Sequence, residues 1–180
     1  MKLILMVFLA MFITQDNLGK IDFGNNKAGK DWQIVNDDVM GGRSQSKILL
    51  TNNSLLFKGS VSLENNGGFA SIRAPWGKYD LSKYTTMTMR CRGTARQFAV
   101  TMQNESVFYR PNFKYFFTPN PEEWQTFELQ LADFKAHQMG RATGETIAAE
   151  QLAEIIRFGI ILYDKQAGTF ELEIDYIGFE

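Results

Sequence analysis

The chain has 180 residues, enough for one domain with a core of its own. Its 19 basic and 20 acidic residues nearly balance, which excludes the basic footprint of a nucleic-acid-binding protein, so no nucleic-acid partner is expected. The single cysteine, Cys91, excludes an internal disulfide and a thiolate metal cluster. The aromatic content of 13 % favours β-structure, because flat rings pack well on pleated surfaces.

The N-terminal segment joins one lysine to an apolar run that ends at residue 13. This run is too short to span a bilayer comfortably and has the length of a signal-peptide core. A small-x-small cleavage motif is missing, so an uncleaved anchor or an apolar first strand is the alternative. We expect residues 1–17 to be a signal peptide or anchor and residues 18–180 to form a single domain. The protein is then exported or periplasmic, or membrane-anchored by its uncleaved N-terminus, without a stable membrane span.

Alternating apolar and polar residues dominate the rest of the chain. Period-two runs occupy residues 55–63, 86–92, 97–103, 126–131 and 170–176. Such runs predict strands with one buried face each, and hence antiparallel sheets.

Two further segments complete the predicted elements. Residues 156–162 are more continuously apolar, which predicts a central strand. Residues 145–155 have apolar residues at helical spacing and predict one short helix. Two facing sheets are the usual way for many half-apolar strands to bury their inner faces. The sequence therefore predicts an all-β fold, an antiparallel β-sandwich of the jelly-roll type with one short helix.

The loop 36–44 combines asparagine, two aspartates and a glycine pair. Gly41 and Gly42 supply unusual backbone angles or allow close approach of another segment. One interpretation is that Asp37 and Asp38 hold a ligand or a cation. The alternative, which side-chain chemistry alone favours, is that these carboxylates satisfy backbone amides of the turn.

A second loop, residues 65–69, contains Gly67 and Gly68 after two asparagines. Asn-Gly is a strong signal for a tight turn, so a hairpin or a bulge explains this loop without a ligand. Ligand binding is the alternative here as well.

Several motifs together resemble one known family, that of complex I intermediate-associated protein 30. The matching segments are Trp32, 36–44, 57–59, 65–73, 156–160 and 168–179. The resemblance implies a galactose-binding-domain-like β-sandwich, which agrees with the strand pattern. It also implies a binding or assembly module, because mitochondrial members act as assembly factors for respiratory complex I. Arg43 and Arg73 lie within the resembling loops and join Asp37 and Asp38 as candidate ligand-binding residues.

Aromatic and basic residues are interleaved over residues 108–117. Tyr109, Arg110 and Phe116, with Trp76, are candidates to line a groove for a sugar or a phosphate, through stacking and cation–π contacts. The alternative is that Phe113, Tyr115 and Phe117 are the core face of a strand, which leaves Lys114 and Phe116 on its other side.

A structural calcium ion is a further hypothesis. Asp22 and Asp175, in the first and last strands, are the candidate oxygen ligands. Two carboxylates are too few for a calcium site unless carbonyl groups complete it. No other cofactor is expected.

Catalytic motifs are not evident. His137 is the single histidine, in an expected loop, and neither a nucleophile elbow nor a phosphate-binding loop is present. The sequence therefore predicts a non-enzymatic module that binds a protein partner and assists the assembly or stability of a complex. The alternative function is a carbohydrate-binding module of an exported protein, with a glycan as its partner.

Overall fold

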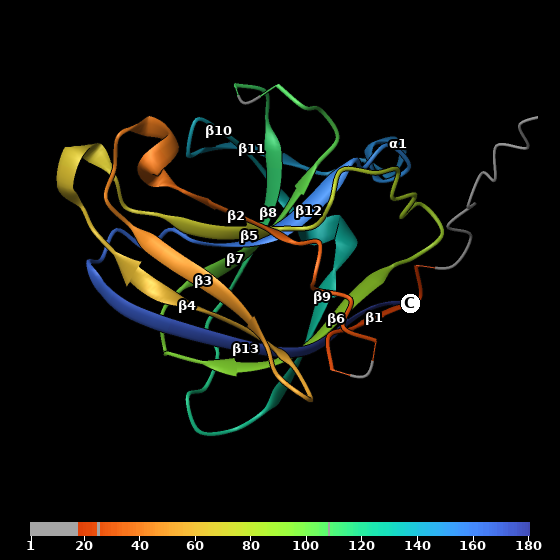
Figure 1. The fold of residues 1–180 in the computed structure, drawn as a ribbon. Helices are drawn as coiled ribbons and strands as arrows, with labels where there is room; N and C mark the ends of the chain where they lie inside the picture. Colours follow the sequence, from red (N-terminus) through yellow and green to blue (C-terminus); the bar gives the residue numbers. More distant parts are fainter. Residues whose placement is uncertain (1–17, 25, 108) are drawn as a thin grey trace, which may run out of the picture.

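The computed structural model describes residues 18–24, 26–107 and 109–180, and two antiparallel sheets face each other in it (Figure 1). The expectation for residues 1–17 falls outside this part of the chain. One sheet has the order β3-β4-β13-β6-β9, with β1 added beside β13. Its strands are β1 (Lys20–Asp22), β3 (Gln45–Leu50), β4 (Leu55–Val61), β6 (Thr86–Gly93), β9 (Gln125–Gln130) and β13 (Gly168–Phe179).

The other sheet has seven strands in the order β11-β10-β8-β7-β12-β5-β2. They are β2 (Gln33–Asn36), β5 (Ala70–Arg73), β7 (Phe98–Gln103), β8 (Asn112–Phe117), β10 (Lys135–Gln138), β11 (Arg141–Thr146) and β12 (Arg157–Leu162). One α-helix, α1 (Ala149–Leu152), lies between the last two of these strands in the chain. Short 3-10 turns occur at Asp37–Met40, Glu64–Asn66 and Leu131–Asp133. The predicted fold class, a two-layer antiparallel β-sandwich, is confirmed.

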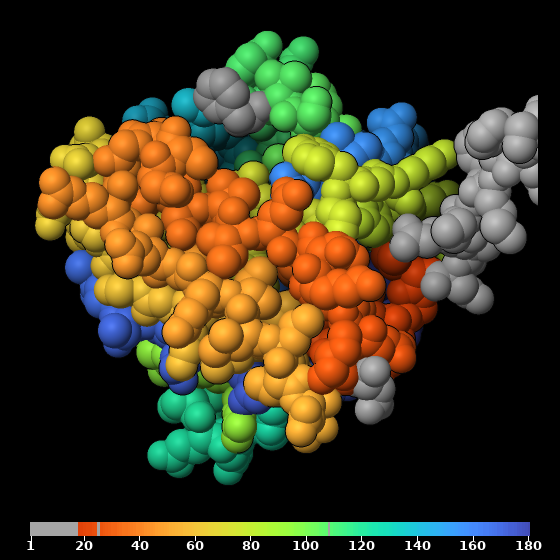
Figure 2. Space-filling view, in the orientation of Figure 1, coloured from red at the N-terminus to blue at the C-terminus, as the bar shows by residue number. Residues whose placement is uncertain are grey.

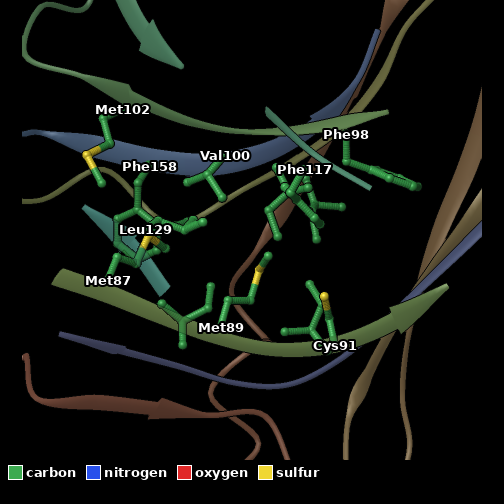
Figure 3. Close-up of a cluster of buried hydrophobic side chains, with 14 of the residues drawn as sticks. Met87, Met89, Cys91, Phe98, Val100, Met102, Phe117, Leu129 and Phe158 are labelled. Carbon is green, nitrogen blue, oxygen red and sulfur yellow. The ribbon is translucent and has the colours of Figure 1, made fainter. Parts of the chain in front are cut away.

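The core fills the space between the two sheets, and it follows from the period-two alternation. Met87, Met89 and Cys91 point inward from β6, while Phe98 and Val100 point toward them from β7 (Figure 3). The polar residues between them face outward, because successive side chains of a strand alternate between the two faces. Burial raises the pKa of the Cys91 thiol to about 12, so this cysteine is an unreactive core residue.

The strands predicted from alternation are present as β4, β6, β7, β9 and β13. The strand predicted to be central, β12, has hydrogen-bonded neighbours on both sides, β7 and β5. Five of its six residues are buried, which explains why its sequence is continuously apolar rather than alternating.

Three local predictions need correction. The helix expected over 145–155 is limited to Ala149–Leu152, because Thr146 still belongs to β11. Residues 65–69 do not form a hairpin: β4 and β5 belong to different sheets, and the chain crosses between them through the 3-10 turn Glu64–Asn66. His137 lies in β10 rather than in a loop. No helix in the described part of the chain is long and apolar enough to cross a membrane.

Candidate functional site

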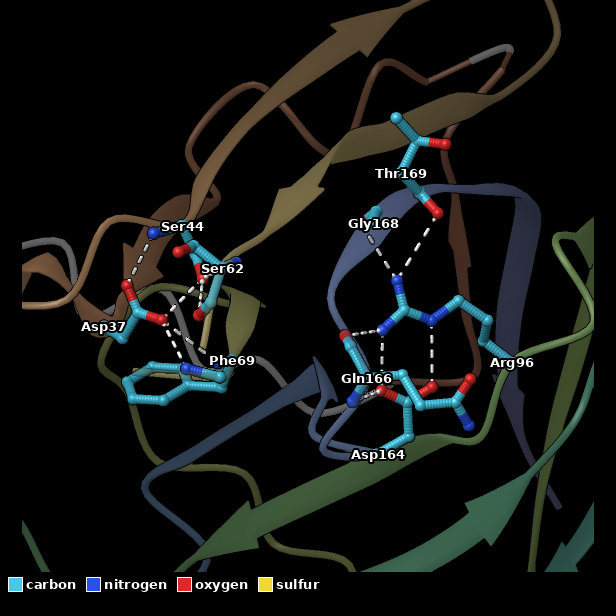
Figure 4. A network of polar contacts seen from close by, with 10 residues as sticks. Asp37, Ser44, Ser62, Phe69, Arg96, Asp164, Gln166, Gly168 and Thr169 are labelled. Carbon is cyan, nitrogen blue, oxygen red and sulfur yellow. Dashed lines mark hydrogen bonds and ion pairs between the residues drawn. The ribbon is translucent and has the colours of Figure 1, made fainter. Parts of the chain in front are cut away.

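The two glycine-paired loops meet at a single buried carboxylate, that of Asp37. Its Oδ1 accepts a hydrogen bond from the amide of Ser44 at 2.8 Å, and its Oδ2 accepts one from Ser44 Oγ (Figure 4). The same Oδ2 accepts the amides of Gly68 at 2.6 Å and Phe69 at 3.3 Å. Burial alone would raise the pKa of Asp37, but these hydrogen bonds outweigh it and the net pKa is lowered. Asp37 therefore holds the loop after β2 against the loop before β5.

The neighbouring glycines leave room for this carboxylate. A Cβ at Gly42 would lie 2.4 Å from the Asp37 carboxyl carbon, and a Cβ at Gly67 would lie 2.6 Å from its Oδ2. Gly41 and Gly68 have backbone φ angles of 87° and 128°, which residues with a Cβ rarely adopt. The geometry thus favours the second interpretation of these loops, in which Asp37 satisfies backbone amides. Its lack of exposed surface argues against a direct role in ligand binding.

The other two candidates of this loop lie at the surface. Asp38 is exposed, and Arg43 forms an ion pair with Glu64 at 2.9 Å. The loop that carries them is seen in orange at the upper left of Figure 2. Arg43 thus links the same two loops that Asp37 joins below the surface, and a ligand-binding role for either residue stays a prediction.

Asp22 and Asp175 lie in one shallow hollow on the outer side of the six-stranded sheet, as the calcium hypothesis requires. However, Arg90 forms an ion pair with Asp175, and Lys20 lies 3.7 Å from Asp22. Among the described residues no group of three or more His, Cys, Asp or Glu side chains is arranged to hold a metal ion. The residues as arranged do not fit calcium, since the ion would have to displace Arg90. Calcium binding stays a prediction.

The aromatic–basic segment divides between core and surface. Phe113 and Phe117 of β8 are buried in the core, and Lys114 and Phe116 project from the other side of the strand, as the strand interpretation predicts. Phe108 lies outside the described residues.

The remaining candidates of this segment occupy the loop before β8. Tyr109 is exposed, and its carbonyl accepts a hydrogen bond from Gln138 at 3.2 Å. Arg110 is paired with Glu105 at 3.3 Å. These two residues are therefore engaged locally, whereas Phe116 belongs to the outer face of the sheet.

The outer face of the seven-stranded sheet brings together basic residues that are far apart in the sequence. Strand pairing places Arg73 of β5 opposite Gly159 of β12, Gly159 opposite Thr101 of β7, and Thr101 opposite Lys114 of β8. Directly paired residues of an antiparallel ladder point to the same face. Arg73 and Lys114 therefore belong to one row across the sheet.

Arg157 lies two residues before Gly159 on the same face, next to this row. Its Nε donates to the carbonyl of Ala74 at 3.0 Å, and its Nη2 donates to Gln33 Oε1 at 2.8 Å. Its guanidinium also lies 4.4 Å from the centre of the Trp76 ring. We call Arg73, Lys114 and Arg157 the basic cluster.

Glycine at position 159 gives Arg73 its place in this cluster. A Cβ there would lie 3.3 Å from Arg73 Cγ and 2.4 Å from the carbonyl oxygen of Ile72. The missing side chain thus leaves the space into which Arg73 extends over β12.

Lys114 is almost fully buried, although it lies on the outer face, with 6 % of its surface exposed. The ring centroids of Phe116 and His137 are 5.6 Å apart. Because His137 is paired with Asn112, and Lys114 lies between Asn112 and Phe116 on the same face, this ring contact spans the position of Lys114. The Tyr163 ring lies 5.5 Å from Lys114 Nζ. Aromatic rings therefore enclose the lysine on the side of β10.

The basic cluster is electrostatically uncompensated. Among the described residues none of its three side chains forms an ion pair with a carboxylate. Burial, and then the charge of Arg157, lower the pKa of Arg73 to about 10. Burial, and then the charge of Arg73, lower the pKa of Lys114. Three cations that repel one another in a partly desolvated place are costly to the fold, which is typical of sites that bind a ligand.

The sequence predicted only part of this arrangement. Arg73, Trp76 and Phe116 were candidate residues, whereas Lys114 and Arg157 were not. Their only sequence signal is a basic residue on the polar side of an otherwise apolar strand, and this signal does not show which strands become neighbours.

A second buried charge was missed as well. Arg96, between β6 and β7, donates to both carboxylate oxygens of Asp164 at 2.8 and 2.7 Å (Figure 4). The same guanidinium donates to the carbonyl of Gln166 in the loop before β13 and to the carbonyl of Gly168 at the start of β13. Hydrogen bonds from Arg96 and its positive charge outweigh the burial that would raise the pKa of Asp164, so this pKa is lowered. This pair is compensated within the chain, in contrast to the basic cluster.

Solved structures with the same fold include carbohydrate-binding modules and part of a larger enzyme. The family 11 carbohydrate-binding module of the cellulase Lic26A-Cel5E of Clostridium thermocellum matches with a TM-score of 0.65 and 16 % identity, over 89 % of this chain and 94 % of that one. The agarase AgWH50C matches with a TM-score of 0.56 and 12 % identity, over 90 % of this chain and 25 % of the agarase. At such low identity these likenesses show the fold alone.

Three curated relatives carry the name "Complex I intermediate-associated protein 30, mitochondrial". The Mus musculus protein is 31 % identical over 168 residues, and the Drosophila melanogaster protein is 26 % identical over 172 residues. The matches cover 82 % and 83 % of this chain but 51 % and 58 % of the relatives, so the chain spans about half the length of these proteins.

The names of these relatives correct one prediction. They are mitochondrial proteins, not exported or periplasmic ones, so the expected exported, periplasmic or membrane-anchored location is wrong. The reason for the error is that a lysine followed by an apolar run is a weak signal without a cleavage motif. The assignment of residues 1–17 as a signal peptide or anchor stays a prediction.

The family itself is shown by a match to its model. The model of complex I intermediate-associated protein 30 matches residues 21–174, which include both glycine-paired loops and all three residues of the basic cluster. This chain therefore belongs to the complex I intermediate-associated protein 30 family.

Proposed function

We propose that this chain is a non-enzymatic binding module that binds a protein partner and thereby assists the assembly or stability of a protein complex. The family and the names of its curated relatives support an assembly-related role. The observation that carries the proposal is the basic cluster, because none of its three cations is paired with a carboxylate in the described part of the chain. The outer face of the seven-stranded sheet is then the surface on which the partner docks.

The test is site-specific photo-crosslinking in the native host. A photoreactive residue replaces Trp76, which is 50 % exposed beside Arg157, and, in a control, Leu49 on the other sheet. We expect a discrete adduct from position 76, identified by mass spectrometry as a subunit of a multi-subunit complex, and none from position 49. The absence of a defined adduct from position 76, or the same adducts from both positions, contradicts the proposal.

A second candidate function is carbohydrate binding. Trp76 and Phe116 are exposed on the same face as the basic cluster, and exposed aromatic rings are the usual stacking surface for sugars. One structure of the same fold, a family 11 module from Clostridium thermocellum, is a complex with a β-1,3-1,4-mixed-linked tetrasaccharide, at a TM-score of 0.61 and 16 % identity. Affinity electrophoresis against mixed-linkage glucan and other polysaccharides tests this function. Retardation that Trp76→Ala removes supports it, and unchanged mobility in every gel rejects it.

A further inference from the structure

The basic cluster contrasts with Arg90, Arg92 and Arg96, each of which is paired with a carboxylate. On the six-stranded sheet, Arg90 pairs with Asp175 and Arg92 with Glu173, although both arginines are only partly buried. Arg96 is buried and is paired with Asp164. The described chain thus supplies carboxylates to these cations but none to the basic cluster. Burial makes an unpaired charge more unfavourable there, because the charge has lost part of its hydration.

Hydrogen-bond donors of the cluster remain available for a ligand. The hydrogen bond found for Arg73 is a long one, from Nε to Ser71 Oγ at 3.4 Å, which leaves both terminal nitrogens of its guanidinium without an acceptor in the described chain. Lys114 Nζ faces the Tyr163 ring and has no hydrogen-bond acceptor among the described residues. Arg157 uses Nε and Nη2 on Ala74 and Gln33 and keeps Nη1. A planar pair of arginine nitrogens matches the two oxygens of a carboxylate.

We propose that the basic cluster binds side-chain carboxylates of an acidic, extended segment of the partner protein. This inference rests on the proposed function and deepens it by naming the chemistry that the partner presents. Arg73 takes one carboxylate through its guanidinium fork, and Lys114 takes a second one.

The spread of the cluster over the sheet favours a peptide over a single small anion. Arg73 and Lys114 stand on β5 and β8, with β12 and β7 between them. At a strand spacing of about 4.8 Å, their backbones are about 14 Å apart, and their charged ends are closer together because Arg73 extends over β12. This span matches several residues of an extended chain, with aromatic contacts available from Trp76 and Phe116.

The experiment measures the binding of a fluorescein-labelled hexaglutamate peptide to the full chain by fluorescence anisotropy, at low and at physiological ionic strength. A hexaglutamine peptide is the neutral probe. We expect the acidic peptide alone to bind, with affinity that falls as salt rises, because the contacts are between charges.

Variants locate the binding site. Arg73→Gln and Lys114→Gln are each expected to weaken binding of the acidic peptide by about tenfold, the effect of losing one charged contact. The control is Lys47→Gln, which removes an exposed cation from β3 of the other sheet and is expected to change binding by less than about twofold. Arg73→Lys keeps the charge and should lose less affinity than Arg73→Gln, and thermal melting monitored by circular dichroism confirms that each variant is folded.

Four outcomes overturn the inference. They are no binding of the acidic peptide at low ionic strength, equal binding of the neutral peptide, equal binding by all variants, and displacement of the acidic peptide by equimolar inorganic phosphate. The last result identifies a site for a single small anion. A partner adduct from position 76 that persists when the acidic peptide fails to bind leaves the proposed function intact and rejects this inference alone.

Discussion

Asp37 shows how a single side chain can organise a motif that resembles a binding loop. Its two oxygens accept hydrogen bonds from residues of both glycine-paired loops. The sequence placed Asp37 and Asp38 together as candidates, but the fold buries the first and exposes the second. Asp37 is the buried residue of the 3-10 turn Asp37–Met40, and the three residues after it are exposed, so the two aspartates have separate roles.

Asp37→Asn is expected to lower the free energy of unfolding by about 2–4 kcal/mol. The neutral amide loses the charge that the buried donors stabilise, and its own N–H groups face backbone amides. Urea denaturation at neutral pH measures the change. Asp38→Asn is the matched control next to it, and it should change stability by less than about 0.5 kcal/mol because the side chain is exposed. Equal effects of the two substitutions would refute the structural role of Asp37.

Lys114→Met is expected to raise the free energy of unfolding by about 1 kcal/mol, since it removes a charge from a desolvated place. The pKa of Lys114 is lowered in the folded state, so the folded protein binds this proton less tightly than the unfolded chain. The destabilisation of the fold by the charge of Lys114 is therefore present at neutral pH and decreases as pH rises toward the ordinary lysine pKa of 10.5.

The comparison for this variant is Lys135→Met, which changes the exposed lysine paired with Lys114 on β10. Chemical denaturation at neutral pH measures whether Lys114→Met raises the free energy of unfolding more than Lys135→Met does. A Lys114→Met protein that is less stable than the parent would show that the lysine has a structural role.

The sequence predicted most of the strands that contribute side chains to the core. Alternation identified β4, β6, β7, β9 and β13 because each buries one face. It did not identify β11, all of whose residues are exposed, or β2 and β10, which have four residues each. Short or exposed strands bury too little apolar surface to leave a period-two pattern.

The candidate site was predictable only in part, for a topological reason. Arg73, Lys114 and Arg157 are separated by about 40 residues each in the sequence, and the strand order alone places β5, β12, β7 and β8 side by side. Local periodicity shows the face to which each residue belongs, but it contains no information on which strands are neighbours.

The ion pair of Arg96 and Asp164 joins two of the loops that cross between the sheets. Arg96 follows β6, Asp164 follows β12, and the guanidinium also reaches the start of β13, so both sheets meet at this contact. Arg96→Met is expected to lower the free energy of unfolding by about 3–5 kcal/mol, because it leaves a buried carboxylate without its partner.

Arg92→Met provides the comparison for this pair. Arg92 forms an ion pair with Glu173, but its side chain is 41 % exposed, and its loss should cost about 1 kcal/mol or less. Guanidinium chloride denaturation of both variants measures the difference. A loss of stability from Arg96→Met no larger than that from Arg92→Met would contradict the structural role of the Arg96–Asp164 pair.

The stability of the folded protein is expected to fall steeply on acidification. Asp37 and Asp164 both have lowered pKa values in the folded state, so their contribution is complete above the ordinary value of 3.8 and is lost as pH falls below it. Urea midpoints at about pH 7, 4 and 3 follow this loss. The Asp37→Asn protein should show a smaller decrease between the same pH values, and parallel curves for the two proteins would contradict this account.

The position of β13 has a consequence for synthesis of the protein. This strand contacts β1, β4 and β6 in the middle of the six-stranded sheet, yet every other strand precedes it in the chain. During translation, therefore, the inner edges of β4 and β6 remain open until residue 179 has left the ribosome exit tunnel. The nascent chain spends that interval with unpaired β-edges, which makes it a natural client for chaperones that shield such edges from other chains.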